Sequence, residues 1–202
     1  MDQVVITIAR QYGSGGRTVG KMLAERLGIS FYDKQIIQMA SDESGIDVKL
    51  FGKVEAGDKV KSSLFGSKDS IYKGGLHQPG SKDFISDENL FNYQAKVVND
   101  LAEKESCVIV GRCADFILQD RTDCLKVFVH ADMKFRADRI VRVYGEREKS
   151  PEARLKEKDK RRAAYYRFYT DMKWGDVANY HIALDSGVIG IEKSAEIIES
   201  LA

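Results

Sequence analysis

The residues best suited to chemistry are a glycine cluster near the start of the chain, Gly13-Ser14-Gly15-Gly16. An apolar, β-branched run at residues 4–8 precedes it and predicts a buried strand. Apolar residues then recur at helical spacing over residues 19–27, before Gly28, a typical helix end. A glycine loop between a strand and a helix exposes backbone N–H groups and the positive helix end. The stretch predicts a phosphate-binding loop; the alternative is a glycine-rich turn that binds nothing.

The loop is related to the P-loop pattern G-x-x-x-x-G-K-[ST] but departs from it. When the pattern is laid on the chain, Arg10 and Gly15 take its two glycine positions. Gly16 takes the lysine position and Arg17 the Ser/Thr position, and Thr18 follows at once. We therefore hypothesise that Arg17 supplies the missing positive charge and Thr18 the missing magnesium-binding hydroxyl. Arg10, at the end of the predicted strand, is a further candidate for binding the phosphates. The alternatives are a strand-end arginine in solvent for Arg10 and an ordinary first-turn threonine for Thr18.

The rest of the chain alternates predicted strands and helices, which indicates a parallel sheet with helices on both faces. The predicted strands are residues 4–8, 29–33, 107–110, 125–129 and 180–184. The predicted helices include 34–41, one from Ser86, one capped by Asp132, one capped by Ser150 that runs to about Met172, and 191–201.

Ligands of such sheets bind beyond the carboxyl ends of the strands. Three groups are predicted to lie there: the loop 10–18, Asp33 and Arg112. For Asp33 the alternative role is a helix cap, and for Arg112 a structural ion pair.

The composition limits the classes of function. The 202 residues are 43% apolar and 31% charged with a net charge of +1, which suits one globular α/β domain spanning 1–202 and argues against nucleic-acid and membrane partners. Three cysteines without metal-like spacing suggest reduced thiols. No apolar run approaches the roughly 20 residues that cross a bilayer, and the chain begins directly with a strand. We expect a cytoplasmic protein.

Two segments are locally unusual. Residues 61–85 are rich in Gly, Ser and Lys and predict a long loop, either a mobile surface insertion or a substrate flap. Residues 136–167 hold twelve Lys/Arg against six Asp/Glu. This excess suggests a counter-charge for phosphates. Two alternatives are a solvated helix face and, because aromatic residues follow at 165–169, stacking on nucleic acid.

Taken together, the motifs resemble the cytidylate kinases, and more closely their cytidylate kinase-like branch, over most of the chain. Similar stretches are the loop and first helix at 6–28, Phe31-Tyr-Asp-Lys-Gln-Ile-Ile37, Val108-Ile-Val-Gly-Arg-Cys-Ala-Asp115, Val127-Phe-Val-His-Ala131, Asp159-Lys-Arg-Arg162 with Tyr165-Tyr166, and Trp174-Gly-Asp176 before Tyr180-His181. Each motif is weak alone, but their order and spacing are fairly specific to the branch.

The resemblance implies a three-layer P-loop NTPase fold with a monophosphate-binding insertion at about 42–90 and a small lid at about 145–160. It implies a nucleoside monophosphate kinase that transfers the γ-phosphoryl group of ATP, with Mg²⁺, to a pyrimidine nucleotide, CMP or dCMP. The partner would be this small-molecule nucleotide, with the oligomeric state left open.

Carried over residue by residue, the resemblance assigns Gly13 to Thr18 to the ATP phosphates and Arg112 to the acceptor phosphate. Asp33 falls in the acceptor motif, and Arg161 and Arg162 lie beside the lid. Two positions depart from the pattern: Gly16 stands at the P-loop lysine, and Cys113 follows Gly-Arg where the family has Asp. These departures keep a rival open, a catalytically weak or inactive nucleotide-binding regulatory protein. A small-molecule kinase with another acceptor is a third possibility.

Overall fold

A five-stranded parallel sheet in the order β2-β3-β1-β4-β5 lies at the centre of the computed structural model, which describes residues 3–56, 75–145 and 150–202. The strands are β1 (Val5–Arg10), β2 (Ser30–Tyr32), β3 (Cys107–Val110), β4 (Cys124–His130) and β5 (Ile182–Asp185). Val5 of β1 pairs with Cys107 on one side and Cys124 on the other, so β1 is central. The predicted parallel sheet is confirmed.

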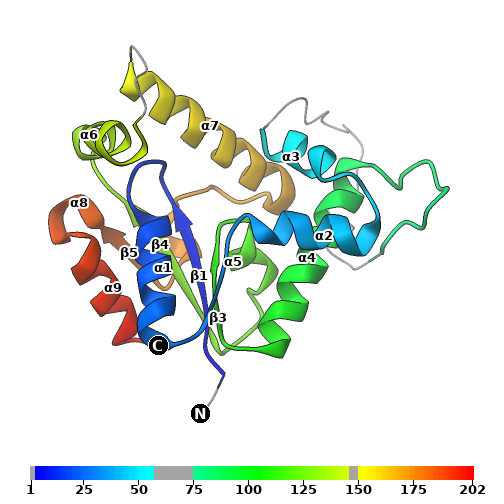
Figure 1. Cartoon of the computed structure of the whole chain (residues 1–202), viewed down its shortest axis with the longest axis horizontal. Coiled ribbons are helices and arrows are strands. Elements are labelled where there is room, and N and C mark those ends of the chain that lie inside the picture. The colour runs from blue at the N-terminus through cyan, green and yellow to red at the C-terminus, as the bar shows by residue number, and fades with distance from the viewer. Residues whose placement is uncertain (1–2, 57–74, 146–149) are drawn as a thin grey trace.

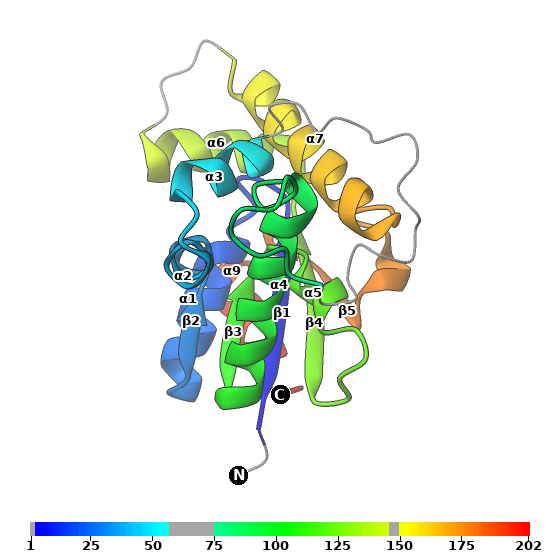
Figure 2. The ribbon, with the colours of Figure 1, turned by 90° about the vertical axis from the view of Figure 1, so that its right-hand side faces the viewer.

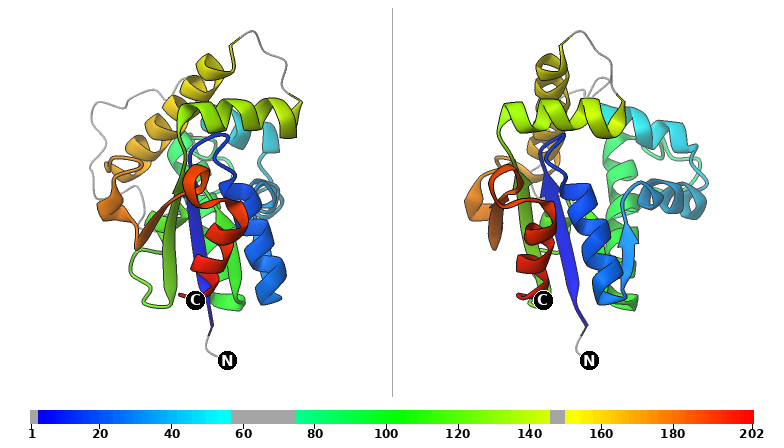
Figure 3. Two further views of the ribbon diagram at one scale, coloured as in Figure 1. Left: turned by 90° about the vertical axis from the view of Figure 1, so that its left-hand side faces the viewer. Right: turned by 60° about the vertical axis from the view of Figure 1, so that its left-hand side comes forward.

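Helices cover both faces of the sheet, as predicted. The longer helices are α1 (Gly16–Leu27), α2 (Gln35–Ser44), α3 (Val48–Ala56), α4 (Asp87–Lys104), α6 (Met133–Tyr144), α7 (Pro151–Thr170) and α9 (Ile191–Glu199). Short turns of helix are α5 (Ala114–Ile117), η1 (Val177–Asn179) and α8 (Ser186–Ile189). Figure 2 shows α4 in front of one face, and Figure 3 shows α1 and α9 in front of the other.

Alternate strand residues supply the two cores, because successive side chains of a strand point to opposite faces. Ile6 and Ile8 of β1 pack in the core that contains the apolar residues of α1 and α9. Val5 packs in the other core, with residues of α2, α4 and α7. Both faces of β1 are therefore buried, which explains why residues 4–8 read as a continuous apolar run.

Local capping sets where the helices of the carboxyl half begin. Asp132 Oδ1 accepts a hydrogen bond from the Phe135 amide at 2.7 Å, and the Ser150 hydroxyl accepts one from Ala153 at 3.3 Å. Both caps are as predicted, and Pro151 occupies the first turn of α7. Figure 1 shows α6 and α7 above the end of the sheet at which β1 finishes.

The structure contradicts one alternative for the basic segment, the stacking of its aromatic residues on nucleic acid. Tyr166 and Tyr169 are buried, and Tyr169 stacks on Phe91 of α4 with ring centroids 4.1 Å apart, so these aromatics are core residues and not a surface for stacking nucleobases. Among the described residues, no helix combines the length and apolar character that crossing a bilayer requires.

Element boundaries also differ from the predictions. Strand β1 continues to Arg10 because its pairing with β4 extends to Val129. The described part of the predicted loop, residues 75–85, forms turns and irregular structure, whereas residues 61–74 lie outside the described residues. The short helix α8 was not predicted; the Asp185 carboxylate accepts hydrogen bonds from the amides of Gly187 and Val188 and so starts this turn.

Candidate active site

The glycine loop between β1 and α1 has the conformation that its sequence predicts. Gly13 and Gly15 have φ values of 81° and 84°, in the left-handed region that favours glycine. A Cβ atom on Gly15 would lie 2.6 Å from Cδ1 of Ile191, and one on Gly13 would lie 3.0 Å from the carbonyl oxygen of Arg136. Both conformation and packing therefore require glycine. Helix α1 begins at Gly16, directly after the loop, and no side chain caps its first turn.

Hydrogen bonds within the loop and from two helices hold it in place. The Ser14 hydroxyl donates to the Gln11 carbonyl at 2.9 Å. Buried Ser186, at the start of α8, donates to the Ser14 carbonyl at 2.6 Å. From α7, the Asp159 carboxylate accepts from the Tyr12 amide at 2.7 Å. The loop is thus fixed between the sheet, α8 and the basic helix α7.

Asp33, just after β2, is a buried carboxylate that two arginines engage. Its Oδ2 atom lies 2.6 Å from Nε of Arg17, and its Oδ1 atom lies 3.6 Å from Nη2 of Arg10. Asp33 is 3% exposed and does not cap α2, whose N-cap residue is Lys34. Arg17, with a side chain that is 53% exposed, leans away from its own loop toward this carboxylate.

Arg112 follows β3 in a strained backbone segment. Gly111, Arg112 and Cys113 have consecutive positive φ values of 79°, 62° and 53°. A non-glycine residue in this region costs of order 1 kcal/mol or more, and such strain is concentrated at functional sites. Gln94 of α4 donates to the Arg112 carbonyl at 3.3 Å, and Arg112 is 9% exposed. The turn holds the arginine at the carboxyl edge of the sheet.

Two arginines of α6 that the sequence analysis assigned only to the basic segment belong to the site. Arg136 and Arg139 are each 5% exposed, so for them the solvated-face interpretation is wrong. Arg136 pairs with Asp159 at 2.5 Å and donates to the Tyr12 carbonyl at 3.2 Å. Arg139 donates to the Thr18 hydroxyl at 2.9 Å. The signal available was their spacing of three, which places both on one helix face directly after a strand.

The two arginines predicted beside the lid differ in surroundings. Arg162 donates to the Arg10 carbonyl at 2.9 Å, and its guanidinium lies 5.3 Å from the centre of the Tyr12 ring. Arg161 forms an ion pair with Glu157 one turn earlier on α7, and both side chains are more than 40% exposed. Arg162 therefore connects α7 to the loop, whereas Arg161 pairs along α7 and is more exposed, although it also lines the cavity described below.

The glycine loop, Asp33, Arg112 and the arginines of α7 line one cavity of about 650 Å³. The loop forms one side, and α7 and the segment after β2 form the others. Its described lining residues include five arginines and two lysines but a single carboxylate: Arg10, Arg17, Arg112, Arg161, Arg162, Lys34, Lys158 and Asp33. Such an excess of positive charge in a partly closed cavity favours a ligand with several negative charges.

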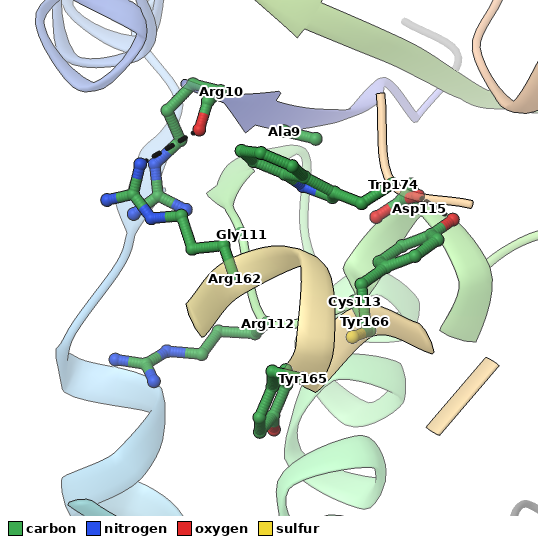
Figure 4. A pocket seen from close by; sticks show the side chains of 10 residues that line it. All are labelled: Ala9, Arg10, Gly111, Arg112, Cys113, Asp115, Arg162, Tyr165, Tyr166 and Trp174. Carbon is green, nitrogen blue, oxygen red and sulfur yellow. Dashed lines mark hydrogen bonds between the residues drawn. The ribbon is translucent and has the colours of Figure 1, made fainter. Parts of the chain in front are cut away.

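A smaller cavity of about 50 Å³ adjoins it and shares three of the arginines. Figure 4 shows the guanidinium groups of Arg10, Arg112 and Arg162 on one side of this cavity and Asp115 with Tyr166 on the other. The Tyr166 hydroxyl donates to Asp115 Oδ2 at 2.7 Å. Burial raises the pKa of Asp115 to about 6, although the tyrosine hydrogen bond acts in the opposite direction.

The fold and this cavity define the class of protein. Solved structures of similar fold include shikimate kinases from Bacteroides thetaiotaomicron (TM-score 0.55, 15% identity, 98% of this chain and 97% of the other) and from Acinetobacter baumannii in complex with shikimate (TM-score 0.53, 17% identity, 99% and 93%). An uncharacterized protein from Eubacterium ventriosum has a TM-score of 0.69 at 28% identity over 98% of both chains. The chain has the α/β fold of the P-loop kinases.

The sequence comparison identifies the family within the P-loop kinase fold. The profile of the cytidylate kinase-like family matches residues 5–188, and the chain belongs to that family. A cytidylate kinase from Methanopyrus kandleri is 23% identical over 206 residues, which cover 98% of this chain and 92% of the relative. The resemblance of the motifs is thereby confirmed at the level of the family.

Proposed function

We propose that the protein is a nucleoside monophosphate kinase that transfers the γ-phosphoryl group of ATP to a pyrimidine nucleoside monophosphate, CMP or dCMP. The observation that carries the proposal is the cavity of about 650 Å³ with seven cationic lining residues and one carboxylate. A nucleoside triphosphate beside a monophosphate supplies a matching cluster of negative charges. The membership of the cytidylate kinase-like family supports the choice of reaction and acceptor.

In this proposal the donor phosphates lie on the glycine loop. Gly13, Ser14, Gly15 and Gly16 supply backbone amides, and the first turn of α1 adds Arg17 and Thr18. A groove of about 740 Å³ between α6 and α8–α9 has Phe135, Val188 and Ile191 among its lining residues, and Ile191 lies beside Gly15 of the loop. Its apolar side chains suit the donor base.

The acceptor side is formed by Arg112 and Asp33. The Arg112 guanidinium suits the acceptor phosphate because it is planar, permanently charged and able to donate two parallel hydrogen bonds. The insertion at about 42–90 would hold the acceptor, and the segment at about 145–160 would be the lid. Residues 57–74 and 146–149 of these segments lie outside the described residues. In this proposal the two segments shield the cavity from water, which otherwise competes as the acceptor.

Phosphoryl transfer needs little covalent chemistry from the protein, so the work of these residues is positioning and charge stabilisation. Arg162 and Arg161 on α7, with Arg112 and Arg17, would surround the oxygens of the moving group. The Thr18 hydroxyl, which now accepts a hydrogen bond from Arg139, would hold Mg²⁺, and the ion would supply further positive charge to the phosphates.

One assay tests the proposal against its rival. The protein is mixed with ATP and Mg²⁺ and with CMP, dCMP, UMP, AMP or GMP in turn, and ADP and the nucleoside diphosphates are measured, with acceptor omitted as the control. We expect diphosphate formation that is fastest with CMP or dCMP. ATP binding without transfer to any acceptor would instead favour the regulatory protein, for which the absence of a lysine at Gly16 is the supporting observation. Failure to bind any nucleotide would contradict both.

A further inference from the structure

Compared with the P-loop pattern, this chain has its cation and its glycine at exchanged positions, Arg10 and Gly16. In the P-loop pattern the first glycine falls at position 10 and the lysine at position 16. This chain has the cation at position 10 and glycine at position 16. The two positions are six residues apart in sequence, but the loop brings them together. We propose that Arg10 is the phosphate-binding cation that replaces the P-loop lysine, a role that rests on the kinase function proposed above.

The first observation is that the two side chains compete for one space. A Cβ atom built on Gly16 lies 2.5 Å from Cβ and 3.1 Å from Cγ of Arg10, and 3.1 Å from Cβ of Val129. Real Cβ atoms do not approach other carbon atoms as closely as 2.5 Å, because interiors are packed at van der Waals distances. With Arg10 in place, Gly16 therefore has no room for any side chain, and a lysine there requires Arg10 to leave.

The second observation is that the other end of Arg10 also depends on a glycine. A Cβ atom on Gly111, which has a φ of 79°, would overlap Nη1 of Arg10. The side chain thus runs from Gly16 at its base to Gly111 at its tip. Arg162 donates to the Arg10 carbonyl at 2.9 Å and supports its backbone. The glycines at both ends explain how a long side chain fits at the centre of the site.

The third observation is where the guanidinium lies. Arg10 lines both the cavity of about 650 Å³ and the smaller one beside Asp115, and Figure 4 shows its guanidinium on the same side as those of Arg112 and Arg162. Its Nη2 atom is 3.6 Å from Asp33 Oδ1, between the donor loop and the acceptor residues. Arg17, the residue predicted to supply the missing charge, is closer to Asp33 at 2.6 Å and is half exposed. Position therefore favours Arg10 over Arg17.

The exchange is tested by reversing it. Arg10→Gly, Gly16→Lys and the double variant Arg10→Gly/Gly16→Lys are compared with the wild type for Mg-ATP affinity by calorimetry and for melting temperature. Arg26→Ala, a surface arginine of α1 that pairs with Glu199 at 3.3 Å, is the matched control and should bind as the wild type does. Arg10→Met, which keeps an unbranched side chain without the charge, covers the case in which a glycine or lysine variant fails to fold.

We expect each single variant, and Arg10→Met, to weaken Mg-ATP binding by about tenfold or more, as loss of a charge-assisted hydrogen bond does. The double variant should bind better than either single variant and melt above Gly16→Lys, because the lysine then has both room and a phosphate. Unchanged affinity in Arg10→Gly and Arg10→Met, or additive losses in the double variant, would overturn the exchange while leaving the kinase proposal intact. Affinity changes as expected without transfer to any monophosphate would support the exchange and contradict the kinase.

Discussion

The carboxylate of Asp159 and the backbone amide of Tyr12, 147 residues apart in sequence, are joined by a hydrogen bond of 2.7 Å. The same carboxylate pairs with Arg136 at 2.5 Å, so α6, α7 and the phosphate loop meet at one acid. Helix α7, which carries Arg161 and Arg162 of the cavity, therefore also holds the loop. The position of α7 and the conformation of the loop therefore depend on each other, and variants of Asp159 can measure this dependence.

Asp159→Ala should destabilise the protein and disturb the loop. The side chains of Arg136 and Asp159 are 6% and 17% exposed, and removal of one partner from a buried pair typically costs roughly 3 kcal/mol because the other charge stays buried. Urea unfolding measures the change. Glu157→Ala, which removes the partner of Arg161 from the exposed face of the same helix, is the control and should cost less than about 0.5 kcal/mol. Equal costs for the two variants would contradict the buried network.

Arg112→Ala should separate acceptor binding from donor binding. Because Arg112 lies at the β3 edge of the cavity and not on the glycine loop, its loss should raise the Kd of CMP by about 10–100-fold and change that of ATP by less than about threefold. Calorimetry with each nucleotide gives both values, and Arg112→Lys tests whether a single point charge suffices. Equal loss of both affinities would argue against the assignment.

Asp115 should make stability depend on pH. Burial raises its pKa from 3.8 to about 6, so the proton favours the folded state; this contribution is complete below pH 3.8 and is lost as the pH rises through 6. Relative to Asp115→Asn, whose amide still accepts from Tyr166, the wild type should lose about 2 kcal/mol of unfolding free energy between pH 4.5 and 7.5. Urea titrations at both values test this. A constant difference between the two proteins would show that the carboxyl titrates normally.

Leu155→Ala should loosen α7 from α6. Leu155 is fully buried and packs with Ala137 and Ile140 of α6, and such truncations cost about 2–5 kcal/mol. Hydrogen exchange should then increase in α7 more than in β1 or β3, because the cavity lies between the two helices and not under the sheet. Leu201→Ala, at a residue that is 55% exposed, is the control and should cost less than about 0.5 kcal/mol. A comparable cost for both leucines would contradict the packing.

Local patterns were sufficient for much of this protein. The apolar run before Gly13, the glycine cluster and the caps at Asp132 and Ser150 each depend on residues within a few positions of one another, and all were predicted. The parallel sheet followed from the alternation of strands and helices. Asp33 directly follows β2, and Arg112 follows β3 after a single glycine. Both were therefore predicted at the carboxyl edge of the sheet.

Other features of the site depend on contacts between distant residues, and no local pattern contains them. The spacing of 136 and 139 places both arginines on one helix face but does not tell whether that face is buried. The contacts of α6 with α7 and with the first turn of α1 decide it. The pairing of Arg17 with Asp33 likewise became visible only in three dimensions.

By itself, the sequence determined that a glycine loop joins a buried strand to a helix, because conformational preference and apolar periodicity act over neighbouring residues. Only the tertiary structure decided where the positive charges lie around that loop. Arg10 and Gly16 compete for one space because the chain folds back on itself there, and such an exclusion arises from packing and not from residue type.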